Sequence, residues 1–145
     1  KTLRGPAEQL SYPMGLNDDE LTLGLHFTAR MLATPLMRTV ARAQIVHREL
    51  PFTQRLPAKD GGQDALVEGV IDLALKADDG QWWVIDYKTG ITTPERLEEK
   101  HGHQLEVYAQ ALSDHLGGVS VKVGIISVLT QSDVDFWRKK QVATG

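Results

Sequence analysis

The chain has 145 residues, 24% of them charged, and a formal net charge of -3. This length suits one domain with a sizeable core, and the acidic balance argues against a free-standing, strongly basic nucleic-acid binder. There are no cysteines, which excludes disulfides, thiolate metal sites and cysteine catalysis and leaves oxygen or imidazole as metal ligands. No apolar run reaches the length of a membrane span and no signal-peptide pattern opens the chain, so we expect a cytoplasmic protein without a membrane partner.

Residues 1–44 are predicted to form a helical lead-in. Asn17 and Glu20 have the spacing of a capping box, which predicts the start of a helix. Thr34 followed by Pro35 predicts a second start, because proline is well suited to the first turn of a helix. Since the chain begins with lysine rather than methionine, we expect it to be a fragment of a longer protein.

Three strands are predicted next. Residues 45–52 alternate, which puts Val46, Leu50 and Phe52 on one face and His47 and Glu49 on the other. The polar residues 53–64 are predicted to form a loop. Two further strands, residues 67–77 and 81–89, are predicted to be joined by a hairpin turn at Asp78-Asp79-Gly80.

The following part of the chain is predicted to contain a long helical region and one more strand. Thr93 and Pro94 combine an N-cap with a first-turn proline, which predicts a helix over residues 94–116. Whether this helix is continuous stays open, because Gly102 could interrupt it. Residues 119–129 become uniformly apolar, as in a buried strand. The order of elements indicates an α/β core with an antiparallel hairpin in its middle.

Two predicted strands each carry an acidic residue, Asp72 and Asp86, where a buried strand would be hydrophobic. Asp86 and Lys88 are two residues apart and share a face, whereas Ile85 and Tyr87 point to the other side. Two carboxylates and an ammonium are the minimal parts of a metal-dependent phosphodiesterase site, because a divalent ion held by carboxylates can activate water and neutralise the leaving oxygen. The alternative is that both aspartates only face solvent at the edge of a sheet.

A few other residues could support such a site. Glu49 lies on the polar face of its strand and could complete a metal shell, although a surface glutamate is the simpler interpretation of this residue alone. Gln104 and Tyr108 are four apart and share a helix face, where they could support the site or simply pack the helix on the sheet. His101 and His103 resemble metal ligands, but a solvated pair at a helix start is the simpler interpretation.

In chain order, four segments resemble the nuclease module of the RecB/AddA-type helicase–nucleases, within the PD-(D/E)XK nuclease superfamily. They are His47-Arg48-Glu49-Leu50-Pro51-Phe52, Gly69-Val70-Ile71-Asp72, Asp86-Tyr87-Lys88 and Gln104-Leu105-Glu106-Val107-Tyr108. The last fits the Gln-x-x-x-Tyr signature that separates this branch from most of the superfamily. The resemblance spans residues 45–129, which would be the catalytic core, and leaves residues 130–145 as a C-terminal tail.

The resemblance implies a restriction-endonuclease-like fold, in which helices flank a central mixed β-sheet and a hairpin carries the acidic residues. It implies a magnesium-dependent deoxyribonuclease, with manganese able to substitute, that acts as an exonuclease on DNA ends in recombinational repair. It also implies the site residues: Asp72, Asp86 and the backbone carbonyl of Tyr87 as metal ligands, Lys88 as the catalytic lysine, Glu49 as an assisting acid, and Gln104 and Tyr108 along the DNA path.

The sequence departs from the family in one respect and lacks a motor motif. The family normally carries a metal-binding histidine on a helix upstream of the Glu49 strand, and the residues around His26 do not fit it. There is also no phosphate-binding loop of the Gly-x-x-x-x-Gly-Lys-Ser/Thr kind, so the helicase motor would lie elsewhere in the same protein or on a partner subunit. The alternative function is a catalytically degenerate nuclease-fold domain that binds DNA or a partner subunit.

Overall fold

The computed structural model describes residues 4–58, 60–89, 93–127 and 135–138. Within these residues the chain forms three helices, then three strands, a fourth helix and two further strands. They are α1 (Arg4–Met14), α2 (Asp18–Leu32), α3 (Pro35–Ala41), β1 (Ile45–Leu56), β2 (Ala65–Lys76), β3 (Trp82–Lys88), α4 (Pro94–His115), β4 (Val121–Ser127) and β5 (Asp135–Arg138).

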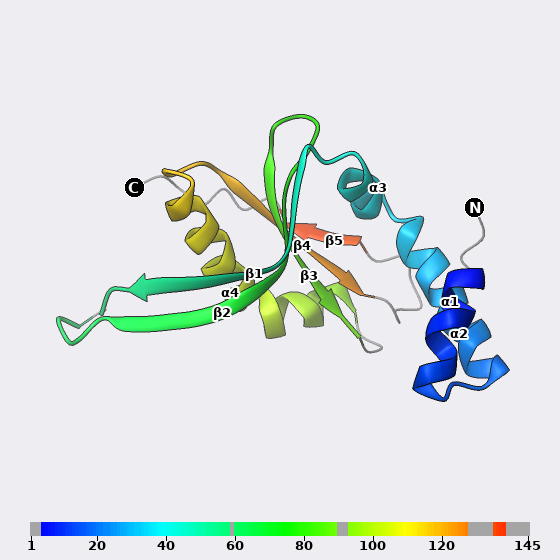
Figure 1. Cartoon of the computed structure of the whole chain (residues 1–145). Helices are drawn as coiled ribbons and strands as arrows, with labels where there is room; N and C mark the ends of the chain where they lie inside the picture. Colours follow the sequence, from blue (N-terminus) through cyan, green and yellow to red (C-terminus); the bar gives the residue numbers. More distant parts are fainter. Residues whose placement is uncertain (1–3, 59, 90–92, 128–134, 139–145) are drawn as a thin grey trace.

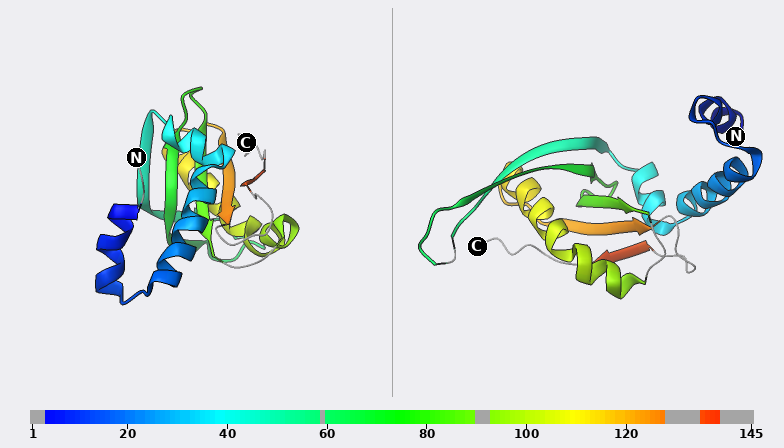
Figure 2. Two further views of the ribbon diagram at one scale, coloured as in Figure 1. Left: turned by 90° about the vertical axis from the view of Figure 1, so that its right-hand side faces the viewer. Right: turned by 90° about the horizontal axis from the view of Figure 1, so that it is seen from below.

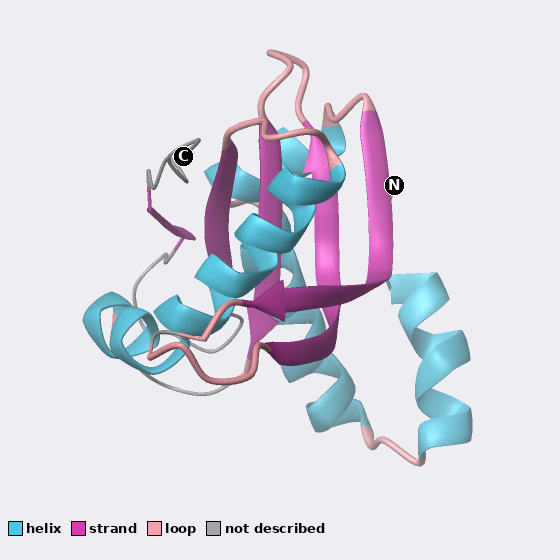
Figure 3. Cartoon of the chain, turned by 90° about the vertical axis from the view of Figure 1, so that its left-hand side faces the viewer, coloured by secondary structure: helices cyan, strands magenta, loops and turns pink. Residues whose placement is uncertain are grey.

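The strands form one sheet in the order β1-β2-β3-β4-β5 (Figure 1). Neighbouring strands are antiparallel except β3 and β4, which are parallel and are connected through α4. Helix α4 lies across one face of the sheet (Figure 3), and α3 packs on the other face (Figure 2). The predicted α/β fold, with a mixed sheet and flanking helices, is therefore confirmed.

The predicted helix starts are confirmed by side-chain caps. The N–H of Glu20 donates to Asn17 Oδ1 and the N–H of Asn17 donates to Glu20 Oε2, each at 2.9 Å, so the capping box is closed. Thr34 and Thr93 cap α3 and α4 by accepting from the backbone N–H three residues farther on. These short-range bonds explain why the sequence predicted where these helices begin.

Helix α4 is continuous, so Gly102 does not interrupt it. Its apolar face, which includes Leu105 and Ala109, is buried against the sheet, and this packing outweighs the weak helix propensity of one glycine. The helix ends as predicted before Gly117, whose φ of 79° is the left-handed conformation that glycine adopts easily.

The first hairpin is longer than predicted. β1 continues to Leu56 instead of ending at Phe52, and β2 already begins at Ala65, so the loop predicted over residues 53–64 is much shorter. The outer part of this hairpin pairs through its backbone along an arm that projects from the sheet (Figure 1). Residues 53–55 are all polar, so no apolar alternation was available to predict a strand there.

The end of the sheet also differs from the prediction. β5 pairs antiparallel with β4, although no element was predicted in residues 130–145, because a strand of four residues is too short to show a period. The predicted strand 119–129 is confirmed over the range of β4, and residues 128 and 129 lie outside the described residues. The predicted turn between β2 and β3 is confirmed, with Gly80 at a φ of 83°.

Apolar side chains form one buried cluster on each face of the sheet. The α4 cluster contains Ile71, Ala74, Val84, Leu97, Leu105, Ala109, Leu112, Val121, Val123 and Ile125. The α3 cluster contains Leu36, Leu73, Leu75, Ala77, Trp83, Ile85 and Ile126. Removal of these side chains from water is the main stabilisation of the layered fold.

In strands β1 and β2 the alternation of side chains between the two faces of the sheet is shifted at one point. The prediction that Val46 shares a face with Leu50 and Phe52 is therefore wrong. Val46 packs on the α3 cluster, whereas Leu50 and Phe52 pack on the α4 cluster. The same change occurs in β2, where Leu73 belongs to the α3 cluster and Ile71 to the α4 cluster. Regular alternation would keep residues two apart on one face. The hairpin bends in this region (Figure 1).

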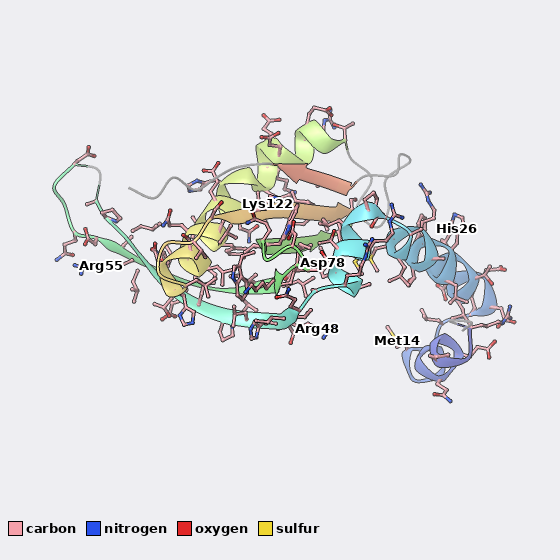
Figure 4. The ribbon with its side chains drawn as sticks, turned by 90° about the horizontal axis from the view of Figure 1, so that it is seen from above. Met14, His26, Arg48, Arg55, Asp78 and Lys122 are labelled. Carbon is pink, nitrogen blue, oxygen red and sulfur yellow. The ribbon has the colours of Figure 1, made fainter. Side chains whose placement is uncertain are left out.

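Helices α1 and α2 extend beyond the sheet (Figure 2). No residue of α2 is buried, and Met14 at the end of α1 is 70% exposed. His26 lies on α2, well apart from Arg48 on β1 (Figure 4). Among the described residues, the structure contains no helix with both the length and the apolar character needed to span a membrane.

Candidate active site

Strand β3 brings a carboxylate into the interior of the protein. Asp86 is only 3% exposed, and Lys88 Nζ lies 2.6 Å from its Oδ2. The two side chains share a face as predicted, while Ile85 and Tyr87 pack with the α3 cluster. Asp86 therefore does not simply face solvent at the edge of the sheet.

The surroundings of Asp86 disfavour its negative charge. Burial raises the pKa of the Asp86 carboxyl, the Lys88 ammonium opposes this rise, and the charge of Asp72 adds to it. Oδ2 of Asp86 accepts no hydrogen bond of good geometry from a described residue, so its close contact with Lys88 is an ion pair. A buried carboxylate oxygen that faces only an ammonium among the described residues is suited to bind a metal cation in its place.

Asp72 lies opposite Asp86, just beyond the last backbone pair of β2 with β3. That pair is Leu73 with Ile85, and each aspartate is one residue farther along its strand. At this point a side chain replaces the backbone acceptor, because the N–H of Tyr87 donates to Asp72 Oδ2 at 2.9 Å. The ladder between β2 and β3 thus opens at the two aspartates, and this bond holds the Asp72 carboxylate beside β3.

The opened strands border a cleft of 450 Å³. Its lining residues are Arg48, Glu49, Asp72, Leu73 and Tyr87. Glu49 and Asp72 therefore lie together, as a role of Glu49 in assisting the site requires. Asp86 and Lys88 alternate with Tyr87 and point toward the α4 side, so Asp72 is the residue that connects the cleft with the buried ion pair.

Glu49 has an uncommon backbone conformation. Its φ of 51° is the one positive value of a non-glycine residue in the described part of the chain, and such a conformation costs about 1–2 kcal/mol. Glu49 and Asp72 face each other across the β1–β2 ladder, yet both are missing from its otherwise continuous backbone pairing. This interruption accounts for the change of faces in both strands, because it shifts the alternation by one residue.

Gln104 and Tyr108 form one hydrogen-bonded unit on α4. Gln104 Nε2 donates to the Tyr108 hydroxyl at 2.6 Å, and the Tyr108 ring packs edge-to-face on Phe52 of β1 with the ring centroids 5.2 Å apart. Gly69 of β2 leaves room for Phe52, since a Cβ there would lie 2.7 Å from the ring. The unit therefore braces the hairpin against α4, and a contact with DNA stays a prediction.

His101 lies near the candidate site, so the interpretation of this residue as a solvated histidine is wrong. It is half-buried on α4, hydrogen-bonds the Gln104 side chain and lies within electrostatic reach of Lys88 and Asp86. Burial, and then the charge of Lys88, lower the pKa of this imidazole. His103 is exposed, as a solvated residue would be. The spacing of His101 and Gln104 on one helix face was the available signal.

The side chains at the site fit a hydrated divalent ion. In the described ranges, no three side chains of histidine, aspartate or glutamate are grouped closely enough to hold a metal ion by themselves. Asp72 and Asp86 offer two carboxylates, and magnesium normally keeps several of its water ligands beside one or two carboxylates. His26 lies well apart from Arg48 (Figure 4), which shares the cleft with Asp72, so His26 does not supply a third ligand.

Known proteins similar to this chain include large helicase–nucleases. One relative, an ATP-dependent helicase/nuclease of Carboxydothermus hydrogenoformans, is 36% identical over 105 residues, which are 64% of this chain and 9% of that protein. A second ATP-dependent helicase/nuclease, from Lacticaseibacillus casei, is 38% identical over 95 residues, which are 59% of this chain and 8% of that protein. The chain thus spans less than a tenth of the length of these relatives.

A solved structure and a family model also match. The structure titled "Crystal structure of SSO0001" has a TM-score of 0.46 and 15% identity, covering 93% of this chain and 58% of that one. The model of the PD-(D/E)XK nuclease superfamily matches residues 6–142, nearly the whole chain. The chain therefore belongs to the PD-(D/E)XK nuclease superfamily.

Proposed function

We propose that this domain hydrolyses DNA phosphodiester bonds with the help of a divalent metal ion. The observation that carries the proposal is the buried carboxylate of Asp86, which lies 2.6 Å from the Lys88 ammonium and opposite Asp72 where the strands separate. A buried ion pair is seldom more stabilising than apolar side chains of similar size. Its presence in the middle of a hydrophobic sheet therefore favours a role in binding and catalysis.

In this proposal the two carboxylates bind the metal ion, and the lysine acts on the phosphate or the attacking water. Asp72 and Asp86 would hold a magnesium ion, or manganese in its place. Such an ion would polarise the phosphate and make a bound water more acidic. Lys88 balances the charge of Asp86 in the free protein. Its side chain is 24% exposed, so the ammonium can turn from Asp86 toward the phosphate or the attacking water on the same face of β3.

Four further residues have supporting roles. The N–H and C=O of a strand residue point to the same neighbouring strand, so the Tyr87 carbonyl is directed to the Asp72 side, as expected of an additional metal ligand. Glu49 would assist the site from the cleft, through a water or directly. Gln104 is exposed and would reach the DNA, while Tyr108 holds it in place.

The proposal also includes the cellular role of the domain and its place in a larger protein. We propose exonucleolytic processing of DNA ends in recombinational repair, in the cytoplasm, with a motor in the same protein or on a partner subunit. The relatives are named for both a helicase and a nuclease, which supports the association of the domain with a motor. The proposed organisation of the single domain is a lead-in (1–44), a catalytic core (45–129) and a tail (130–145). Leu36 of the lead-in and β5 of the tail nevertheless belong to the folded body.

A second candidate is a nuclease-fold domain that binds DNA or a partner without cleavage. It is favoured by one observation, the lack of a third acidic or histidine ligand beside Asp72 and Asp86 among the described residues. Such a site would bind a metal weakly. Cleavage distinguishes the two candidates, because both predict binding and only the first predicts turnover.

The test is cleavage of linear single- and double-stranded DNA in magnesium or manganese by the wild type, Lys88→Ala and Lys76→Ala. Lys76 is a matched control, because it is a strand lysine that pairs with Trp82 at the far end of the β2–β3 ladder. We expect metal-dependent cleavage by the wild type and Lys76→Ala, and a loss of about 100-fold or more in Lys88→Ala. Unchanged cleavage by Lys88→Ala would contradict the assignment, and DNA binding by the wild type without cleavage in either metal would favour the second candidate.

A further inference from the structure

We infer that Arg48 binds a backbone phosphate of the DNA in the cleft beside Asp72, next to the phosphate that would be cleaved. This inference rests on the proposed function and adds a substrate-binding residue to it. Arg48 stands directly before Glu49 on β1.

The interrupted hairpin brings Glu49 into the cleft beside Arg48. Neighbouring residues of a regular strand point to opposite faces, yet Arg48 and Glu49 line the same cleft, since the left-handed backbone of Glu49 redirects the strand. Asp72 and Leu73 are also neighbours and share the cleft from the other strand. A strained interruption at facing positions of two strands is typical of a functional site, because a purely structural hairpin would be more stable without it.

Arg48 is available to an external anion. It is exposed and, within the part of the chain that the structure describes, it forms no ion pair, whereas Arg55 on the hairpin arm pairs with Asp64 at 2.7 Å. Its side chain nevertheless lines the cleft together with Asp72 and Tyr87.

The chemistry of the cleft suits a phosphate. Glu49 and Asp72 would repel an anion, so an anion can enter only where a cation faces it, and Arg48 is the one cation among the lining residues that the structure describes. A guanidinium donates two parallel hydrogen bonds to phosphate oxygens, while the half-buried Tyr87 offers an apolar ring surface to a sugar. The cleft of 450 Å³ lies within the range of about 300–1,000 Å³ typical of small-molecule sites.

Asp72 is the residue that the cleft shares with the proposed catalytic group. This residue lines the cleft, accepts the Tyr87 N–H and interacts electrostatically with Asp86. A phosphate held by Arg48 would therefore belong to the same DNA strand as the phosphate at the two aspartates. Arg48 would set the register of that strand at the site.

The test is the binding of a fluorescein-labelled hairpin oligonucleotide with a single-stranded tail, measured by fluorescence anisotropy without metal at about 50 to 200 mM KCl. The proteins are the wild type, Arg48→Ala, Arg48→Lys and Arg42→Ala. Arg42 is the matched control, because it is an exposed arginine just before β1 that forms no ion pair with a described residue.

We expect Arg48→Ala to bind about tenfold more weakly than the wild type. The slope of log affinity against log salt should also fall by about 0.7 to 0.9, the loss of one phosphate contact. Arg48→Lys should keep the slope but regain only part of the affinity, since lysine keeps the charge and loses the fork of donors. Arg42→Ala should bind like the wild type.

Three results would overturn the inference: no binding by the wild type, equal binding by Arg48→Ala and the wild type, or an equal loss in Arg42→Ala. Cleavage by the same proteins separates this inference from the proposed function. A wild type that binds through Arg48 but does not cut would keep the inference and reject hydrolysis. Metal-dependent cleavage whose kcat and KM are unchanged in Arg48→Ala would keep hydrolysis and reject the inference.

Discussion

The two ends of the β2–β3 ladder are built in different ways. From Leu73 toward the hairpin turn the strands pair through their backbones, and Leu75 and Ile85 are completely buried. Beyond Leu73 the ladder opens, the side chain of Asp72 accepts the backbone bond, and Asp86 is buried as an ion pair. The closed end therefore supplies stability, while the open end keeps polar and strained features that a scaffold alone would not need.

The largest expected effect is at the closed end. Leu75→Ala would leave a cavity in the α3 cluster and should lower the free energy of unfolding by about 2–5 kcal/mol, measured by urea denaturation. The control is Leu66→Ala on the hairpin arm, where the leucine is 67% exposed and the change should stay within about 0.5 kcal/mol. Equal effects of the two substitutions would show that the closed end is not the stabilising region.

A smaller loss is expected at the open end. Asp72→Ala removes the acceptor of the Tyr87 N–H and should lower the free energy of unfolding by about 1–3 kcal/mol. Asp72→Asn keeps an acceptor oxygen and should recover most of that loss, although it removes the charge. Urea denaturation and the hydrogen exchange of the Tyr87 amide measure both effects. Equal exchange protection of this amide in all three proteins would argue against the bond.

The conformation of Glu49 allows a test of strain. Glycine adopts a positive φ easily, so Glu49→Gly should be more stable than Glu49→Ala by about 1 kcal/mol, although glycine normally weakens a strand. Both variants lack the carboxylate, so their comparison isolates the backbone. Chemical denaturation measures the difference, and a lower stability of Glu49→Gly would mean that the backbone at position 49 is not strained.

The last prediction concerns how the stability of the folded protein changes with pH. Burial raises the pKa of Asp86 in the folded chain above its ordinary value of 3.8, so the folded state holds this proton more tightly than the unfolded state. The stability that this group contributes is present below the unfolded pKa and is lost as pH rises through the folded pKa. Asp86→Asn cannot ionise, so its melting temperature should rise relative to the wild type between pH 4 and pH 7. A difference that shrinks over this range would contradict the direction of the shift.

Local features of the fold were predictable from the sequence. The caps at Asn17, Thr34 and Thr93, the turn at Gly80 and the shared face of Asp86 and Lys88 depend on residues a few positions apart. Such short-range patterns are repeated in many proteins, so the sequence carries their signal.

Features that depend on contacts between distant residues were not predictable. The change of faces in β1 follows from an interruption shared by Glu49 and Asp72, and the bond from Tyr87 to Asp72 forms only where two strands separate. β5 has too few residues to show alternation. The approach of His101 to Lys88 requires α4 to be packed on the sheet. In each case the tertiary arrangement decides what the local pattern leaves open.

The most direct test of the central claim is manganese binding, followed by electron paramagnetic resonance, in the wild type, Asp86→Asn and Lys88→Ala. If Asp72 and Asp86 hold the metal, Asp86→Asn should lose most of the binding. Lys88→Ala should bind at least as tightly as the wild type, because its ammonium no longer competes at 2.6 Å from Asp86 Oδ2. Wild-type affinity in Asp86→Asn, or a loss of binding confined to Lys88→Ala, would contradict the account.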